Sequence, residues 1–197
     1  MRWLAGTAAA LIVIAAVYFG SAYAALNDLV GAARRADGAR LLARTDVARV
    51  TGSIARQVVG AYFDRLGKGR DPGMTERLVA GAVGGTLADL LAAQLLTADG
   101  LSRLLDDGHI EALPETPALT GLPRLSDLDL ADAGALFGRL HLITPVEMSI
   151  RIGSGARDAD AAIRLHLDGH GWRLSAITLP RARLDELIAR LPARSSR

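Results

Sequence analysis

The chain has 197 residues, half of them hydrophobic, with 23 basic and 21 acidic side chains and a formal net charge of +2. This near-neutral balance, together with only 4% aromatic residues, excludes the basic and aromatic surface typical of nucleic-acid-binding proteins. The absence of cysteine excludes a disulfide scaffold, thiol catalysis and a cysteine-ligated metal centre.

The first 27 residues have the character of a membrane-spanning segment. Arg2 is followed by no charged residue until Asp28, and residues 11–19 are continuously apolar. A helix needs about 20 mostly apolar residues to cross the hydrocarbon of a bilayer. The sequence therefore predicts a transmembrane anchor or a signal segment over residues 1–27.

Two fates of this segment are open. Residues 22–24, Ala-Tyr-Ala, have the small-x-small form after which a signal peptidase cuts, so cleavage would leave a chain beginning at Ala25. Against cleavage, the apolar stretch 3–19 is longer than the roughly 7–15 residues of a secretory signal core. Helical periodicity also continues past the cut site to Ala33. Retention as an anchor fits these observations better, and secretion after cleavage following Ala24 is the alternative.

The charges flanking the segment predict its orientation. The amino terminus and Arg2 precede the span, whereas the first charge after it is the acidic Asp28. This asymmetry favours a cytoplasmic amino terminus. We therefore expect a single-pass protein of a bacterial inner membrane, with residues 28–197 forming one domain that faces the periplasm.

The first part of this domain has helical periodicity. Apolar residues recur on one stripe from Val47 to Leu66, after a cap at Thr45 or Asp46. A second helix is predicted over residues 75–95 and a short one from Thr97, ended by Gly108. Residues 108–133 contain three prolines and form an unusually long connector.

The period of the apolar pattern changes from 3.6 to 2 after residue 139. A strand pair broken at Pro145 is followed by a hairpin with its turn at residues 168–171, and Pro180 suits the first turn of a final helix. Helices first and strands later predict an α+β domain, with helices packed on one face of an antiparallel sheet of about four strands.

Four segments, taken together, form a pattern that can be compared with known families: Tyr-Ala-Ala-Leu-Asn-Asp-Leu at 23–29, Ala-Asp-Gly-Ala-Arg-Leu-Leu at 36–42, Asp-Val-Ala-Arg-Val at 46–50 and Gly-Trp-Arg-Leu-Ser-Ala-Ile-Thr-Leu-Pro at 171–180. With the N-terminal anchor, they resemble the bacterial membrane-anchored family known as domain of unknown function 2939. The resemblance implies an anchor followed by an α+β domain, and supplies no catalytic residues. A closing Trp-Arg-Leu strand also occurs in cone-shaped folds of the nuclear transport factor 2-like class.

Two groups of residues are candidate sites. Asp106, Asp107, His109 and Glu111 bring metal-ligand types together where the connector begins, although a solvated acidic helix end explains them equally well. On the strands, His141, Arg164 and His166 are predicted on the less apolar side of the sheet, where they would bind a small anion if that side is concave, or simply face solvent.

No catalytic signature accompanies these groups. Ser154 lies between two glycines but lacks the Gly-x-Ser-x-Gly form of a nucleophile elbow. We therefore predict a non-catalytic binding module for an envelope protein or a small ligand, with no cofactor and no nucleic-acid partner. The alternative is an envelope enzyme with a pocket on the polar sheet face and His166 and His141 as general acid and base. The sequence leaves the oligomeric state open.

Overall fold

The computed structural model describes residues 2–66, 97–108, 124–130, 132, 136, 138–152 and 161–190. The helix predicted over residues 75–95 and much of the 108–133 connector lie outside the described residues. The described part contains an N-terminal apolar helix, several further helices and a four-stranded antiparallel sheet, so the predicted α+β class is confirmed.

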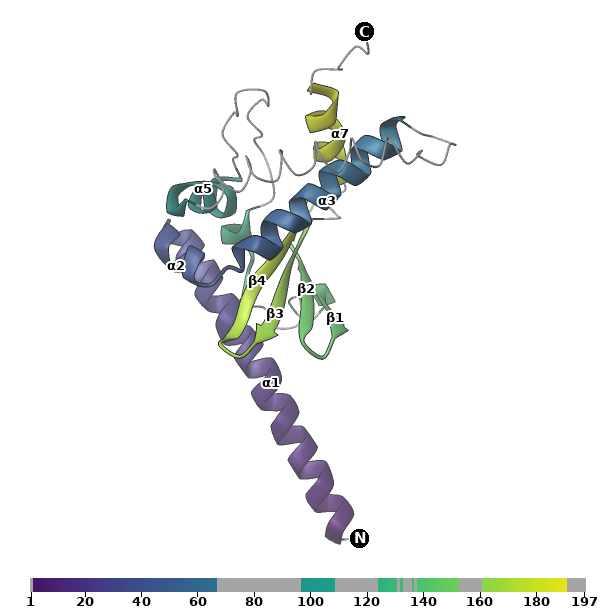
Figure 1. Cartoon of the computed structure of the whole chain (residues 1–197). Helices are drawn as coiled ribbons and strands as arrows, with labels where there is room; N and C mark the ends of the chain where they lie inside the picture. Colours follow the sequence, from purple (N-terminus) through teal and green to yellow (C-terminus); the bar gives the residue numbers. More distant parts are fainter. Residues whose placement is uncertain are drawn as a thin grey trace.

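One unbroken helix, α1 (Arg2–Arg34), runs from the amino terminus into the body of the protein (Figure 1). At about 1.5 Å per residue it is about 50 Å long. The large apolar side chains between Leu11 and Val17 are 60 to 69% exposed. From Ala22 onward the helix is buried along one stripe that includes Leu26, Leu29 and Ala33. The predicted continuation of the helix past residue 24 is thus confirmed.

Three of the helices that follow α1 begin at a side-chain cap. Asp37 accepts a hydrogen bond from the Arg40 backbone N–H at the start of α2 (Gly38–Ala43). Asp46 accepts one from the Arg49 N–H at the start of α3 (Val47–Leu66), which decides between the two predicted caps.

Thr97 caps α5 (Ala98–Ser102), and its Oγ1 accepts from the Gly100 N–H. A π-helical turn, η1 (Arg103–Asp107), continues from α5 and ends at Gly108, whose φ of 63° is left-handed, as predicted for a helix-stopping glycine. A 3-10 turn, η2 (Leu125–Asp127), lies within the predicted connector.

The sheet has strand order β1-β2-β3-β4, with all neighbours antiparallel. The strands are β1 (Leu140–Thr144), β2 (Glu147–Arg151), β3 (Ala162–Asp168) and β4 (Gly171–Thr178). Both predicted turns are confirmed, one at Pro145 and Val146 and the other at Gly169 and His170. The final helix, α7 (Arg181–Arg190), begins directly after Pro180.

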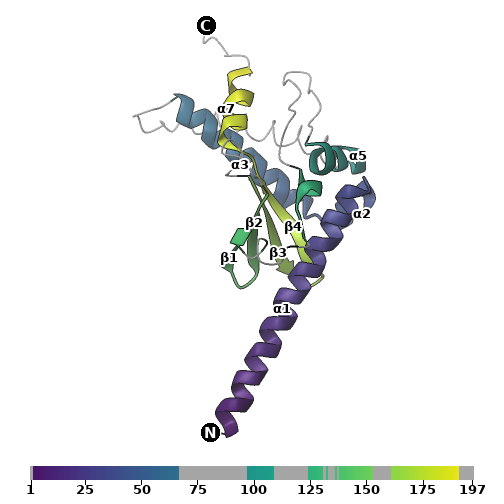
Figure 2. The ribbon, with the colours of Figure 1, turned by 180° about the vertical axis from the view of Figure 1, so that it is seen from behind.

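One face of the sheet forms the core. Side chains alternate along each strand, so that Met148, Ile150, Leu165, Trp172 and Leu174 share a buried face. The second half of α1 packs on this face, and buried residues of α3, α5 and η1 belong to the same apolar cluster. The burial of apolar surface therefore joins the N-terminal helix to the C-terminal sheet, which are far apart in the sequence (Figures 1 and 2).

The free edge of β4 is covered by the chain that leads into α3. The Leu174 N–H donates to the Arg44 carbonyl (2.9 Å), and the Asp46 N–H donates to the Leu174 carbonyl (2.8 Å). Further along, Gln57 of α3 donates to the Ile177 carbonyl (2.7 Å) and accepts from the Leu179 N–H (2.8 Å). These bonds satisfy backbone groups that an open sheet edge would leave unpaired.

Gly38 allows α2 and α5 to approach closely, because a Cβ at this position would overlap the Ala98 carbonyl group. We expect Gly38→Ala to lower the free energy of unfolding by about 1–3 kcal/mol, the usual cost of overpacking. The matched control is Gly60→Ala in α3, where a Cβ meets nothing within 4 Å and should add about 0.5–1 kcal/mol through helix propensity. Urea unfolding of the full chain in detergent micelles, followed by circular dichroism, measures both. Equal effects of the two changes would contradict the close approach.

Candidate functional site

The three predicted ligand-binding residues lie on one face of the sheet. In the strand register His141 pairs with Ser149, which pairs with Arg164, while His166 lies between Glu147 and Arg173. Cross-strand partners share a face. We call the side of the sheet that carries Glu147, Arg164, His166 and Arg173 the polar face.

His166 and Glu147 form the closest pair of opposite type on the polar face. The His166 Nδ1 lies 3.7 Å from a Glu147 carboxylate oxygen, and the two side chains are 19% and 27% exposed. A distance of 3.7 Å is too long for a hydrogen bond but permits an ion pair when the imidazole is protonated. The partial burial of both groups would strengthen such a pair relative to one in open solvent.

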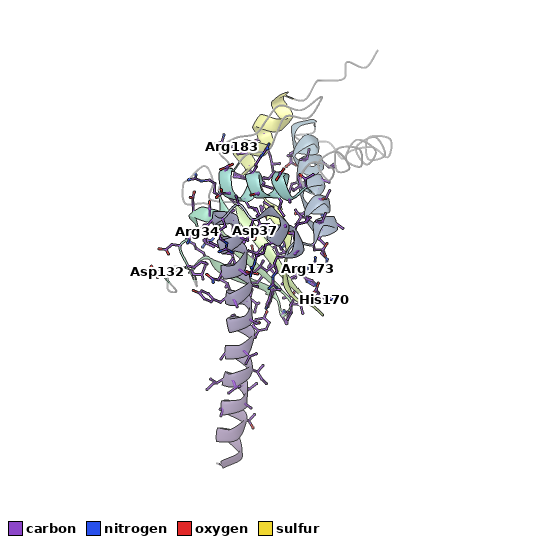
Figure 3. The ribbon with its side chains drawn as sticks, turned by 90° about the vertical axis from the view of Figure 1, so that its left-hand side faces the viewer. Arg34, Asp37, Asp132, His170, Arg173 and Arg183 are labelled. Atoms are coloured by element: carbon purple, nitrogen blue, oxygen red, sulfur yellow. The ribbon has the colours of Figure 1, made fainter. Side chains whose placement is uncertain are left out.

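Arg173 occupies the other side of His166. Its Nη2 donates to the Thr45 carbonyl (3.0 Å), and its Nη1 lies 4.0 Å from an Asp168 carboxylate oxygen. Arg173 and His170 lie together on the side of the molecule opposite to Asp132 (Figure 3). Arg173 therefore links the polar face to the chain entering α3, and the sequence reasoning missed it as a member of this cluster.

Three nitrogens on the polar face are buried without a hydrogen-bond partner among the described residues: Arg164 Nε, His166 Nδ1 and Arg173 Nε. Buried polar atoms in proteins are nearly always paired with protein groups or water. Arg Nε is always a donor, and a protonated imidazole is a donor at both nitrogens. Because protein atoms cover these three nitrogens, a partner would meet the remaining, exposed parts of the half-buried Arg164, His166 and Arg173 side chains.

His141 is set apart from this cluster. It lies on the outer strand β1 and is exposed. His141 is level with Arg164, which lies two strands away and two residues along β3 from His166. With neighbouring strands about 4.8 Å apart and about 3.3 Å per residue, the backbones of His141 and His166 are about 12 Å apart. The two histidines share a face, as predicted, but are too far apart to exchange a proton directly.

The predicted metal cluster is only partly within the described residues. Asp106 and Asp107 belong to η1, whereas His109 and Glu111 lie outside the described residues. The Asp106 carbonyl accepts a hydrogen bond from the Ser126 hydroxyl (3.1 Å), which ties η1 to η2. Within the described part of the chain no three His, Asp or Glu side chains are grouped as metal ligands would be. The metal site therefore stays a prediction.

Two cavities within the described residues are small and apolar. One, of about 50 Å³, lies between α1 and the sheet and is lined by residues that include Phe19, Leu26 and Met148. The other, of about 10 Å³, lies beside Leu104 and Ile177. Pockets for small-molecule ligands usually measure about 300–1,000 Å³. Neither cavity is lined by His141, Arg164 or His166.

The junction between α1 and the sheet is built around Trp172, which is 1% exposed. The Tyr18 ring meets the indole edge to face, with centroids 5.3 Å apart, and Phe19 meets Tyr18 at 5.1 Å. The indole N–H donates to the Ser21 hydroxyl oxygen (3.0 Å). From the sequence, Tyr18 and Phe19 near the end of the apolar segment suggest a membrane interface. No sequence pattern indicates their contact with Trp172 or the role of Ser21.

Polar contacts fasten the rest of α1. Asp28 accepts hydrogen bonds from Arg40 Nε (2.7 Å) and Arg44 Nε (2.9 Å), which binds α1 to α2. Tyr23 donates to the Leu130 carbonyl (3.2 Å), and Arg34 donates to two carbonyl groups around η2. The second half of α1 is thus held by contacts on several sides as well as by its apolar stripe.

Comparisons with known proteins bear on this N-terminal half. The model of the family described as "Protein of unknown function (DUF2939)" matches residues 11–104, from within α1 to η1. The predicted resemblance to this family is confirmed over those residues. The sheet, with the Gly-Trp-Arg-Leu segment at 171–174, lies outside the match. No curated protein and no solved structure matches the chain.

The junction predicts a specific energetic coupling between Ser21 and Trp172. Ser21→Ala should cost about 1 kcal/mol or more, because it leaves the buried indole N–H unpaired. After Trp172→Phe, which removes that donor, Ser21→Ala should cost almost nothing. Urea unfolding of the four chains in detergent micelles measures this double-mutant cycle. Equal costs of Ser21→Ala in both backgrounds would show that the hydrogen bond contributes no stability.

Proposed function

We propose that the chain remains in the membrane as an uncleaved single-pass protein and presents its α+β domain at the membrane surface. The helix Gly6–Arg34 is long and apolar enough to span a membrane, as both an anchor and a signal sequence can be. The observation that carries the proposal is the junction, because Tyr18 and Ser21 contact Trp172 and both precede the cut site after Ala24.

Cleavage after Ala24 would remove part of the core. Trp172 would lose the ring of Tyr18 and the acceptor of its indole N–H, and Ala22, which is 3% exposed, would also leave the buried stripe. Losing packing around a large buried aromatic side chain typically costs several kcal/mol, a large part of the roughly 5–15 kcal/mol that stabilises a domain. A segment that is cleaved and discarded does not usually carry contacts of this kind.

The orientation of the proposal rests on charge. Arg2 lies before the span and Asp28 is the first charge after it, an arrangement that favours a cytoplasmic amino terminus. The domain would then face the periplasm of a bacterial cell. If the segment were cleaved instead, the same domain would be a soluble periplasmic protein.

The domain would act as a binding module through the polar face. Arg164, His166 and Arg173 gather two guanidinium groups and an imidazole, all half-buried, on one face of the sheet, which favours contact with an anionic or acceptor-rich group. Neither of the two cavities described above is lined by polar-face residues, so we infer that the polar face meets a partner that docks on the surface, such as an envelope protein.

The mature amino terminus tests the anchor. The full chain is expressed in a Gram-negative host, and its mass is measured alongside membrane fractionation. We expect a membrane-bound chain that has kept its first 24 residues and begins at Met1. A soluble chain that begins at Ala25 would overturn the proposal. An Ala24→Leu variant, which removes the small residue at the cut site, serves as a control because its mass should differ from that of the parent only by the substituted side chain, with no residues removed from either chain.

The second candidate function is an envelope enzyme. The Glu147 carboxylate beside His166 is the observation in its favour, because a carboxylate commonly orients a catalytic imidazole. In this case the polar face would bind a substrate, with His166 and His141 as general acid and base. The separation of the two histidines by a whole strand weighs against their acting on one atom.

One variant, His166→Ala in the full chain, separates the two functions. For a binding module, a photo-crosslinking amino acid placed at His141 should capture an envelope protein in cells, and His166→Ala should reduce that adduct severalfold while purified protein shows no turnover. The same crosslinker at Asp64, an exposed position on α3, is the control. Turnover of any substrate class that disappears with His166→Ala would establish the enzyme instead.

A further inference from the structure

Exposed apolar side chains are concentrated in two places among the described residues. One is the free half of α1, and the other is the β1–β2 turn, where Leu142, Ile143 and Val146 are 48%, 42% and 44% exposed. Apart from these, Tyr23 is the large apolar residue with comparable exposure, and its hydroxyl donates to the Leu130 carbonyl. Isolated exposed apolar residues are common, but three within five positions of one turn form a patch.

This turn lies level with the place where α1 leaves the domain. The Leu167 N–H donates to the Val146 carbonyl (2.8 Å), and Leu167 pairs across the sheet with Trp172, which packs against Tyr18. The contacts therefore form a row from the β1–β2 turn across the sheet to residue 18. Figures 1 and 2 show the β1–β2 turn and the β3–β4 turn at the same end of the sheet, from which the free half of α1 projects. His170, in the β3–β4 turn, lies at this end in Figure 3.

The length of the free helix brings this end of the sheet to the bilayer. Residues 2–17 precede the first domain contact at Tyr18 and, at about 1.5 Å per residue, extend about 24 Å. The hydrocarbon core of a bilayer is about 30 Å thick. Since α1 is unbroken through the junction, no linker lifts the domain away from the membrane. Tyr18 and the residues level with it must then lie at the membrane interface.

We propose that the β1–β2 turn is a second membrane contact, which inserts Ile143, Pro145 and Val146 into the interfacial region of the bilayer that holds α1. This inference rests on the proposed retention of the anchor. Residues 142–146, Leu-Ile-Thr-Pro-Val, contain no charge that would have to be desolvated. Pro145 also lacks a backbone N–H, and the Val146 N–H donates to the Thr144 hydroxyl (3.3 Å), so two backbone positions at the tip present no unpaired donor to lipid.

A second membrane contact would restrict the orientation of the domain more than α1 alone does. A single helix leaves the domain free to rotate about the helix axis and to tilt, whereas a second contact across the sheet prevents both motions. The polar face would then keep a constant angle to the membrane. The ligand at the turn is the lipid surface itself, recognised by apolar burial.

Site-specific fluorescence in vesicles tests the proposal on the full chain. The protein has no cysteine, so one introduced cysteine carries one environment-sensitive NBD dye. We use Val146→Cys at the turn, Ile14→Cys in the free helix and Asp64→Cys on α3 as the solvent-exposed control. The vesicles contain phosphatidylethanolamine and phosphatidylglycerol, with or without a lipid that carries a nitroxide quencher near the top of its acyl chain.

We expect the dye at position 146 to be blue-shifted and quenched by the nitroxide lipid, like the dye at position 14 and unlike the dye at position 64. Adding Ile143→Asp should reduce the quenching at position 146 toward that at position 64, because a charge near lipid is unfavourable. The quenching at position 14 should not change, and unchanged circular dichroism verifies that the domain is still folded.

The other outcomes are distinguishable. Absence of quenching at position 14 would show that α1 does not span the bilayer, and the proposed anchor itself would fail. Quenching at position 14 without quenching at position 146 would overturn only the second membrane contact. A blue shift at position 146 that is insensitive to nitroxide lipid and disappears on dilution of the protein among vesicles would show that a second copy of the chain covers the turn.

Discussion

The packing of Trp172 against α1 is the interaction on which the rest of the architecture depends. It joins Tyr18 of α1 to the second residue of β4, which is more than 150 positions later in the sequence. Trp172 is only 1% exposed. The hydrogen bond to Ser21 gives the contact a direction as well as an area, because it sets which face of α1 meets the sheet.

The same helix must satisfy two environments. Between Leu11 and Val17 its large apolar side chains are exposed, whereas from Ala22 to Ala33 they are buried along one stripe. An apolar surface of the first kind requires burial, in lipid or against other apolar groups, and a stripe of the second kind is stable against a protein core. Since no break separates the two parts, the depth of the helix in a membrane and the position of the domain are fixed together.

The rigid connection between α1 and the sheet also determines how the polar face is oriented relative to α1. Arg164, His166 and Arg173 lie on the sheet whose opposite face packs on α1. Under the two proposed membrane attachments, the sheet would present this cluster at a constant height and direction, which suits recognition of a partner that is also held at the membrane.

The amino-acid sequence by itself determined much of the local structure: the apolar helix, the helix beginning near Thr97 and ended by Gly108, and the strands with their turns at Pro145 and residues 168–171. It left the cap of α3 open between Thr45 and Asp46, and it did not indicate the cap at Asp37. Each depends on hydrogen bonds or periodicity within a few residues, which a single sequence displays directly. The sequence also indicated that His141, Arg164 and His166 share a face, because alternation along strands fixes this.

Only the tertiary structure decided which distant residues meet. The Glu147, His166 and Arg173 row, the edge pairing of Leu174 with residues 44–46, and the contact of Ser21 with Trp172 all depend on strand order and helix docking. These arrangements are selected by the total burial of apolar surface and by the satisfaction of backbone groups across the whole fold. No local pattern encodes such a sum, so the residues that couple the membrane helix to the sheet become visible only once the chain is folded.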